Sequence, residues 1–410
     1  MKKRKILWLM VWAALMTGVR AAAPDEKEDK SLSLHIGTAM FRDKILELAP
    51  GSVVSAEKGR VVDFPRMIKE VRESRLVFFG ENHDSLPMHD AQLRIIEALY
   101  AQDKKLAIGL EMFPITLQAV LDKWSAGTLT RDEFIREGKW YVNWSLNFGF
   151  YEKIFDFARE NRIPLCGLNA PKEAITTIRM KGWEALSEDE KKMVPQPDLS
   201  NQEHRLLIRT ILESAEIPHQ MKGAGLEMMF EGLYRAQAAW DEVMASNLVE
   251  AVKKEGRKIV VLAGSGHLLF NLGINRRAYE KSRWPSKTII GVTVPKGKPT
   301  LQVSRSLGDY VWGFVEEEKP AFPAIGLSFK KFEGIENLVI DNKAVEGVAK
   351  GAEFEKGDVI LSMDGRAFSD INEARIYLAQ FKWGDEVKIR LLRNGQVKEI
   401  ALKFEPSKEN

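Results

Sequence analysis

The sequence predicts an α/β fold with a mostly parallel central sheet flanked by helices, followed by a small β-rich domain. Short apolar runs alternate with amphipathic runs of helical spacing, which favours strands and helices in alternation. The apolar runs are continuous, as in parallel strands that are buried on both faces. After residues 316–321, short strands with Gly and Asp turns surround one helix. A chain of 410 residues, 45% of them hydrophobic, can hold two or three such domains.

Residues 1–21 have the pattern of a cleaved signal peptide. A cationic start, "MKKRK", precedes the apolar run "ILWLMVWAALMTGV" and the small residues of "RAAAP". The apolar run is shorter than the roughly twenty residues of a membrane span. No cysteine ends the segment, so no lipid attachment is expected there. The sequence therefore predicts a periplasmic or secreted protein, in which the single Cys166 forms no internal disulfide.

Loss of this segment changes the charge balance. Five of the 61 basic residues lie in it, which leaves 56 against 58 acidic residues, so the formal charge moves from +3 to −2. No basic surplus remains to drive binding to nucleic acid, and we expect no nucleic-acid partner.

The α/β domain is expected over residues 60–315, after an N-terminal extension at 22–59. Apolar runs predict strands at 75–81, 105–113, 162–170, 257–267 and 287–294. Helical spacing predicts helices at 86–102, 115–127, 151–161 and about 225–255. The charged, proline-containing stretch 187–204 is expected to interrupt this alternation as an insertion.

The C-terminal part resembles a PDZ domain over residues 322–405, after a linker at 316–321 and before a tail at 406–410. The resemblance lies in "KGAEFEKGDVILSMDG", in the helix "INEARIYLAQF" and in "DEVKIRLLRNGQVKEIALKF". Such domains add a peptide to a sheet edge. The resemblance implies that "AIGLSF" holds the C-terminus of a peptide or protein, through Ile325, Gly326, Leu327 and Phe329. Alternatively, the domain only packs against its own neighbour.

Polar side chains follow the predicted strands of the α/β domain. Ligands of open α/β sheets bind beyond the carboxyl ends of the strands. The residues expected there are Glu81, His83, Asp84, His89, Glu111, Asn169 and His267. Imidazoles and carboxylates are ligands of a divalent metal, for which His83, Glu111 and His267 are the candidates, or of haem iron, and they also serve acid–base chemistry. Each residue has a plainer interpretation as a core histidine, a helix cap or a solvated loop residue.

The long helix offers two more candidates. Tyr234, Gln237, Asp241 and Met244 share one face, next to an apolar stripe that would pack on the sheet. Gln237 and Asp241 could therefore reach the strand ends, or face solvent. The stripe consists of Met229, Leu233, Ala236, Trp240 and Val243.

Six ordered blocks resemble the ChaN-like proteins of the haem-binding-uptake and Tiki superfamily, over roughly residues 60–315. They are "FFGENHDSLPMHDAQLRIIEAL", "GLEMFP", the aromatic stretch 140–151, "IPLCGLNAP", "RAQAAWDEVMA" and "AGSGHLLFNLGI". The resemblance implies haem or iron acquisition, with haem bound between the copies of a homodimer. Haem iron is held by tyrosine or histidine in such proteins, so Tyr141, Tyr151 and Tyr234 are candidates.

Relatives in the wider superfamily, of the Tiki and erythromycin-esterase type, imply a second function. They are proposed to be metal-dependent peptidases or esterases that use paired Gly-x-x-His motifs, here Gly80–His83 and Gly264–His267. The catalytic candidates are then Glu81, His83, Glu111 and His267.

Three hypotheses therefore stand: a haem-binding protein, a hydrolase, and a non-catalytic scaffold whose cluster is an internal hydrogen-bond network. The residues predicted to form the site are Glu81, His83, His89, Glu111, Asn169, Gln237, Asp241 and His267.

Overall fold

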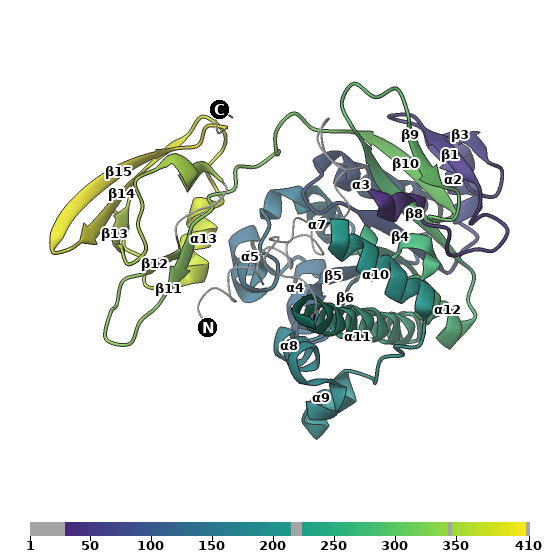
Figure 1. Ribbon diagram of the computed structural model, residues 1–410, viewed down its shortest axis with the longest axis horizontal. Helices are drawn as coiled ribbons and strands as arrows, with labels where there is room; N and C mark the ends of the chain where they lie inside the picture. Colours follow the sequence, from purple (N-terminus) through teal and green to yellow (C-terminus); the bar gives the residue numbers. More distant parts are fainter. Residues whose placement is uncertain (1–28, 215–223, 343–346, 407–410) are drawn as a thin grey trace. The chain divides into compact units, whose positions relative to one another are not determined.

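The computed structural model describes residues 29–214, 224–342 and 347–406 (Figure 1). The chain forms two compact units, of which the first contains residues 29–129 and 151–317 and the second contains residues 130–150 and 318–406. The expected signal peptide and nearly all of the expected tail lie outside the described residues. Within these ranges, no helix combines the length and the apolar character that a membrane crossing needs.

An eight-stranded sheet forms the centre of the first unit, in the order β3-β2-β10-β8-β4-β7-β5-β6. The six strands from β10 to β6 are parallel, and the antiparallel pair β2 and β3 extends one edge. This arrangement confirms the predicted fold class. The strands are β2 (Val53–Ser55), β3 (Arg60–Val62), β4 (Leu76–Glu81), β5 (Leu106–Pro114), β6 (Leu165–Asn169), β7 (Lys258–Gly264), β8 (Ser286–Val294) and β10 (Tyr310–Val315).

Two groups of mutually contacting helices accompany this sheet. One group is built around the long helix α11, and the other around α3. The first group contains α8 (Lys172–Lys181), α10 (Gln202–Ser214), α11 (Ala224–Glu255) and α12 (Ile274–Ser282), and α9 (Glu188–Met193) follows α8 along the chain. The second group contains α2 (Phe64–Val71), α3 (Leu86–Gln102), α4 (Gln118–Ser125) and α7 (Glu152–Glu160).

The strands are mostly apolar because helices cover both faces of the sheet. Every residue of β4 and β5 is buried. Alternate residues of a strand point to opposite faces. Leu76 and Phe78 of β4, and Ala107 of β5, belong to the core that also contains the stripe of α11, and that stripe is buried as predicted. The intervening residues, such as Val77 and Phe79, are buried on the other face.

Three features differ from the sequence-based expectation for this unit. β1 (Ile45–Leu48) and β2 lie in the stretch 22–59 that was set apart as an extension; β2 joins the main sheet and β1 pairs with β9 (Leu301–Ser304). The charged stretch 187–204 contains α9 and the first turn of α10. The predicted strand 257–267 ends at Gly264, so that His267 lies in the short helical turn Ser265–His267.

The second unit contains a five-stranded antiparallel sheet, in the order β11-β12-β13-β14-β15, and the helix α13 (Ile371–Leu378). Its strands are β11 (Ser328–Lys330), β12 (Val339–Asn342), β13 (Val359–Met363), β14 (Glu386–Arg393) and β15 (Gln396–Lys403). This β-rich architecture is the one that the PDZ resemblance implies. Two short helices of residues 130–150, α5 (Arg131–Glu137) and α6 (Trp140–Asn143), belong to the same compact unit.

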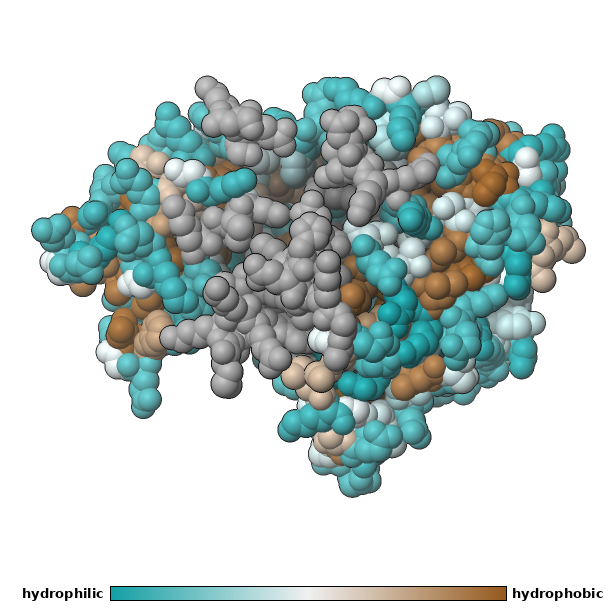
Figure 2. Space-filling model, in the orientation of Figure 1, coloured by the Kyte–Doolittle hydropathy of each residue, from teal (hydrophilic) through white to brown (hydrophobic). Residues whose placement is uncertain are grey.

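On the face shown in Figure 2, the coloured surface is mostly hydrophilic, with hydrophobic areas between the polar side chains.

Candidate functional site

Three of the predicted site residues, Glu81, Glu111 and His267, lie in or just after three neighbouring strands of the sheet. β7 lies between β4 and β5, and Gly264 at the end of β7 is paired with Glu81 at the end of β4. The carboxyl ends of these parallel strands share one edge, so Glu81, Glu111 and His267 lie at the same end of the sheet. Glu111 crosses to β7 and accepts a 2.7 Å hydrogen bond from the amide of Gly264.

The faces of the sheet divide these residues into two groups. Glu81 lies on the same face of β4 as Val77 and Phe79, because residues two apart on a strand share a face. Its partners come from α3 and from the residue before α7. Glu111 has the parity of Ala107 and faces α11. We call them the Glu81 group (Glu81, His83, His89, Gln92, Tyr151) and the His267 group (Glu111, His267, Asp241, Gln237, His204).

In the Glu81 group, one fully buried carboxylate collects several donors. Tyr151 and Gln92 donate hydrogen bonds to it, and Nδ1 of His83 lies 2.9 Å from its Oε1. Nδ1 of His89 lies 3.4 Å from Oε2. Burial alone would raise the pKa of Glu81, but the charge of His89 and the hydrogen bond from His83 hold it far below its ordinary value. Burial would lower the pKa of His89, but the charge of Glu81 raises it above its ordinary value.

In the His267 group, one imidazole lies between two carboxylates. Nδ1 of His267 is 2.6 Å from Oδ1 of Asp241, and Nε2 is 3.2 Å from Oε1 of Glu111. Burial would lower the pKa of His267, but the charges of Glu111 and Asp241 raise it to about 10. The pKa of Asp241 falls to about 2, because the charge of His267 and the nearby imidazole of His204 outweigh burial. At neutral pH the group is therefore an imidazolium held by two carboxylates.

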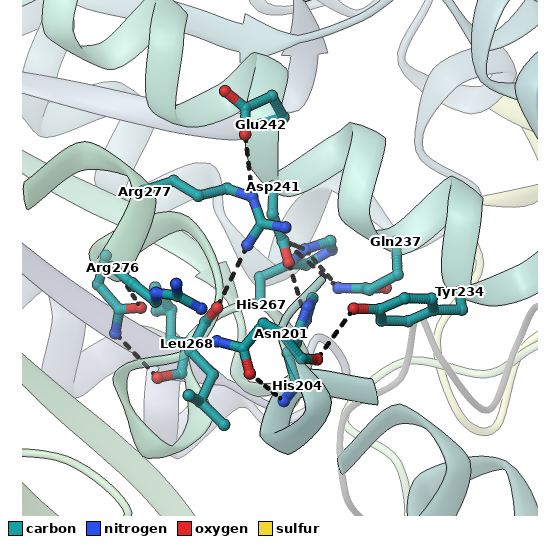
Figure 3. A network of polar contacts seen from close by, with 12 residues as sticks. Asn201, His204, Tyr234, Gln237, Asp241, Glu242, His267, Leu268, Arg276 and Arg277 are labelled. Atoms are coloured by element: carbon teal, nitrogen blue, oxygen red, sulfur yellow. Dashed lines mark hydrogen bonds and ion pairs between the residues drawn. The ribbon is translucent and has the colours of Figure 1, made fainter. Parts of the chain in front are cut away.

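Figure 3 shows how helices α10 and α11 supply the rest of this group. Gln237 and Asp241 of α11 point toward His267, and the side-chain amide of Gln237 lies 2.8 Å from its Nδ1. Toward a protonated ring this amide presents its oxygen, which accepts, rather than its nitrogen. His204 of α10 approaches Asp241 from the other side, with Nε2 3.2 Å from Oδ2. Burial keeps the pKa of His204 below its ordinary value. Close to this group, Nε of Arg277 lies 3.1 Å from Oε2 of Glu242.

Glycine is required where the two groups meet. A Cβ atom on Gly264 would lie 2.7 Å from Cε1 and 2.8 Å from Nε2 of His83. A Cβ atom on Gly80 would lie 3.1 Å from both Cα and Oγ of Ser265. The first glycine of each Gly-x-x-His motif thus allows the ends of β4 and β7 to pack closely. The motifs have a structural reason to contain glycine, whatever the site binds.

Several predicted residues have other roles. Asn169 donates to the backbone oxygen of Glu111, at 2.9 Å, and so ties β6 to β5. The haem-ligand candidates Tyr141, Tyr151 and Tyr234 are all buried, with at most 5% of each residue exposed. Tyr151 donates instead to Glu81, and Tyr234 lies 3.2 Å from the backbone oxygen of Asn201.

The metal set His83, Glu111 and His267 is not assembled. In the described part of the chain, no group of three or more His, Cys, Asp or Glu side chains is arranged to hold a metal ion. The reason is that both ring nitrogens of His267 already face carboxylates, and His83 is paired with Glu81 on the other face.

Sequence reasoning missed His204 and Gln92. His204 was overlooked because it ends a charged, proline-containing stretch. Its spacing to Leu207, Ile208 and Ile211 is that of a buried helix face, and all four are buried. This spacing was the available signal. Gln92 lies one turn after His89 on the same helix, and this spacing could have identified it.

Comparisons with known proteins agree with this architecture. The family described as "Haem-binding uptake, Tiki superfamily, ChaN" matches residues 67–278, and "PDZ domain" matches residues 323–404. A solved structure described as cofacial heme binding to ChaN of Campylobacter jejuni is 20% identical, with a TM-score of 0.52, over 66% of this chain and 96% of that one. An erythromycin esterase in its open conformation is 13% identical, with a TM-score of 0.36, over 64% and 83%.

One curated relative comes from a plant. The chloroplastic Protein RETICULATA-RELATED 5 of Arabidopsis thaliana is 26% identical over 144 residues, which is 33% of this chain. The chain spans only 19% of the length of that protein.

Replacing Gly264 by Ala is expected to lower the free energy of unfolding by about 1–3 kcal/mol, because the new methyl group overlaps the ring of His83. Urea denaturation measures the change. The control is Gly225→Ala, where no atom lies within 4 Å of the added Cβ, and no loss is expected. Equal stability of the two variants would contradict the close approach.

Replacing His267 by Gln is expected to cost roughly 3–5 kcal/mol, because Glu111 and Asp241 lose the cation between them. The pH dependence has a defined sign. The raised pKa of His267 makes its stabilisation complete below pH 6.5 and lost as the pH rises through about 10. Asp241 acts in the opposite direction, with stabilisation that is present above pH 3.8 and lost as the pH falls through about 2.

The free energy of unfolding of the unchanged protein should therefore fall between pH 6.5 and 10, and this alkaline decline should be shallower in His267→Gln. Chemical denaturation across this range measures both curves. Parallel curves would show that His267 does not carry the extra proton.

Proposed function

We propose, from the premise that this chain belongs to the haem-binding-uptake family of the Tiki superfamily (ChaN), that it is an exported haem-binding protein with a peptide-binding PDZ domain. The cationic and apolar segment at residues 1–21 supports export. Binding of haem between the two copies of a homodimer is part of this proposal.

The buried groups at the sheet edge do not suit haem iron. His267, their most exposed histidine, is only 4% exposed, and both its ring nitrogens face carboxylates. Of the seven tyrosines, all of which are described, Tyr279 of α12 is the single exposed one, at 46%. A tyrosine oxygen is an established protein ligand of haem iron. We therefore propose Tyr279 as the iron ligand.

The surroundings of Tyr279 fit an anionic porphyrin. The guanidinium of Arg283, which is exposed, lies over its ring, 5.3 Å from the centroid. A cation beside the ring can pair with a haem propionate. The single observation that carries the proposal is this exposed phenol beside a guanidinium, in a unit whose other tyrosines are more buried. The Glu81 and His267 groups then stabilise the sheet edge, as the scaffold hypothesis expects of an internal network.

The hydrolase hypothesis has weaker support. A general base must be ready to accept a proton near neutral pH. His267 has a pKa of about 10 and is already protonated there, and Glu111 is its counter-ion.

Haemin titration of the purified full chain tests the haem proposal. We expect a shifted, saturable Soret band, and at least a tenfold weaker affinity in Tyr279→Phe, since an iron–oxygen bond is lost. His35→Ala is the control, because among the described histidines His35 is the exposed one, with 70% of its side chain accessible. An unshifted spectrum would remove haem binding, and equal affinity of Tyr279→Phe would remove only the ligand assignment.

The loop Ala324–Leu327 supports peptide binding. The backbone amides of Ile325, Gly326 and Leu327 precede β11. Within the described part of the chain, none of the three donates a hydrogen bond to another residue. Gly326 has φ +76°, a conformation that turns successive amides toward one point and can form an anion-binding concavity. The side chains of Leu327 and Phe329 are buried in the core, so the backbone is what the loop offers. β11 follows directly, as an edge strand that can pair with a peptide.

A degenerate pool of decapeptides with free C-terminal carboxylates is expected to bind about tenfold or more tightly than the same pool with C-terminal amides, because the amides of the loop would pair with a charge. Fluorescence anisotropy of labelled pools measures this. Gly326→Val should abolish the difference, since valine disfavours positive φ. Gly395→Val, at φ +79° in the turn between β14 and β15, is the control for strain alone. Equal binding of both pools would rule out the carboxylate site.

A further inference from the structure

Residues Thr130–Phe150, which we call the arm, come from the sequence of the ChaN-like domain but pack with the PDZ domain. They follow α4 and precede α7, and they form one compact unit with residues 318–406. The arm contains α5 and α6. Its position is not explained by haem binding or by a PDZ fold alone.

Three polar contacts tie the arm to the helix α13. Nε of Arg136 lies 2.7 Å from Oε1 of Glu373. Arg375 donates through Nη1 to the backbone oxygen of Tyr141, at 2.7 Å. Asn147 donates through Nδ2 to the backbone oxygen of Ala379, at 2.9 Å. These contacts run from the first turn of α13 to the residue after its end.

An aromatic contact ties the arm to the start of the PDZ domain. The rings of Phe150 and Phe322 meet edge to face, with centroids 4.8 Å apart. A Cβ atom on Gly149 would lie 2.5 Å from the ring of Phe322, so the backbone of the arm lies directly against it. Phe322 is two residues before the loop Ala324–Leu327 that we propose to hold a carboxylate.

Two of the three polar contacts of the arm, those at Arg375 and Ala379, lie on the flank of α13 that faces the edge strand β11, whereas the contact at Glu373 lies nearer the other flank. Ala374 and Leu378 face the PDZ core, and Tyr377 marks one flank through its bond to Asp364, just after β13. At 100° per residue, Arg375 lies on the opposite flank. In the sheet order, β11 is the edge strand on the far side of β13 from β14 and β15, so this opposite flank is the one toward β11.

Burial of Ile376 gives independent support. It is 6% exposed, yet it does not belong to the hydrophobic core of the PDZ domain that includes Ala374 and Leu378. Around the helix, Ile376 lies between Glu373 and Arg375. Those two residues contact α5 and α6, so Ile376 faces the arm as well. α5 and α6 both contact α13.

A peptide that adds to β11 occupies the space between β11 and α13. We propose that the arm is an intramolecular regulator of this groove: it competes with a C-terminal peptide for the flank of α13, and peptide binding displaces it. The inference rests on the proposed peptide binding. When no peptide is bound, the segment Thr130–Phe150 of the same chain occupies this flank of α13.

The contacts of the arm suit reversible release. The Arg136–Glu373 pair is solvent-exposed, with 50% and 29% of the side chains accessible, and such pairs contribute little to stability. The guanidinium of Arg375, whose pKa is lowered by burial, has a backbone oxygen rather than a carboxylate as its partner in the arm. A contact of this kind can hold the arm in the absence of peptide and yield to a better partner.

The full chain with Arg136→Gln and Asn147→Ala tests the proposal, because both changes lie in the arm and leave the groove residues intact. Binding of the free-carboxylate decapeptide pool should become about threefold to tenfold tighter than in the unchanged protein. Lys139→Gln is the matched control, since it removes the same charge from an exposed position of the arm. It should bind like the unchanged protein. Thermal unfolding of all three proteins checks that each is folded.

Each outcome separates the two levels of the argument. Equal binding by the double variant and the unchanged protein, or weaker binding by the double variant, would overturn the regulatory role while the peptide site stands. Binding by none of the proteins would overturn peptide binding itself.

Hydrogen exchange gives a second, direct measurement on the unchanged chain. Saturating peptide should accelerate exchange of the amides of α5 and α6, because displaced helices lose their packing on α13. Unchanged or slower exchange there, with peptide bound, would show that the arm stays in place and would overturn the proposal.

Discussion

The close approach of β4 and β7 at Gly264 is the constraint on which the site depends. The absence of a side chain at this position allows the ring of His83 to lie against the end of β7. It also leaves the amide of Gly264 in line with the carboxylate of Glu111. Gly264 therefore contacts both groups: it leaves room for His83 on one face of the sheet and donates to Glu111 on the other. Each face can thus hold its own charged network at the end of β7.

Electrostatics explains why these networks tolerate burial. An isolated buried carboxylate is strongly unfavourable, and each acid here has an imidazole as a partner on its own face. Glu81 is paired with His89, and Glu111 and Asp241 share His267. The raised pKa values of His89 and His267 are the consequence of this pairing.

Part of this organisation could be predicted from sequence. Continuous apolar runs gave the parallel strands, and helical spacing placed Gln237 and Asp241 on the face that meets His267. The period of two along each strand separates Glu81 and Glu111 onto opposite faces only once the register of β4 and β5 against β7 is known, so the sequence predicts one cluster where the structure has two groups. The spacing of His204 predicts its burial but not its place at the site, because its partner Asp241 comes from another helix. The arm could not be assigned either, since only tertiary contacts place Phe150 against Phe322.

The boundary between the two units has a physical consequence. Phe150 packs with the PDZ domain, and the next residue, Tyr151, donates to Glu81 in the first unit. Consecutive Cα atoms are about 3.8 Å apart, so no spacer separates these two anchors. Tyr151 is fully buried, and the centroid of its ring lies 4.1 Å from that of His89, so the Glu81 group holds this side chain in place. Residues 130–150 therefore rejoin the first unit at a side chain that a buried charged network already fixes.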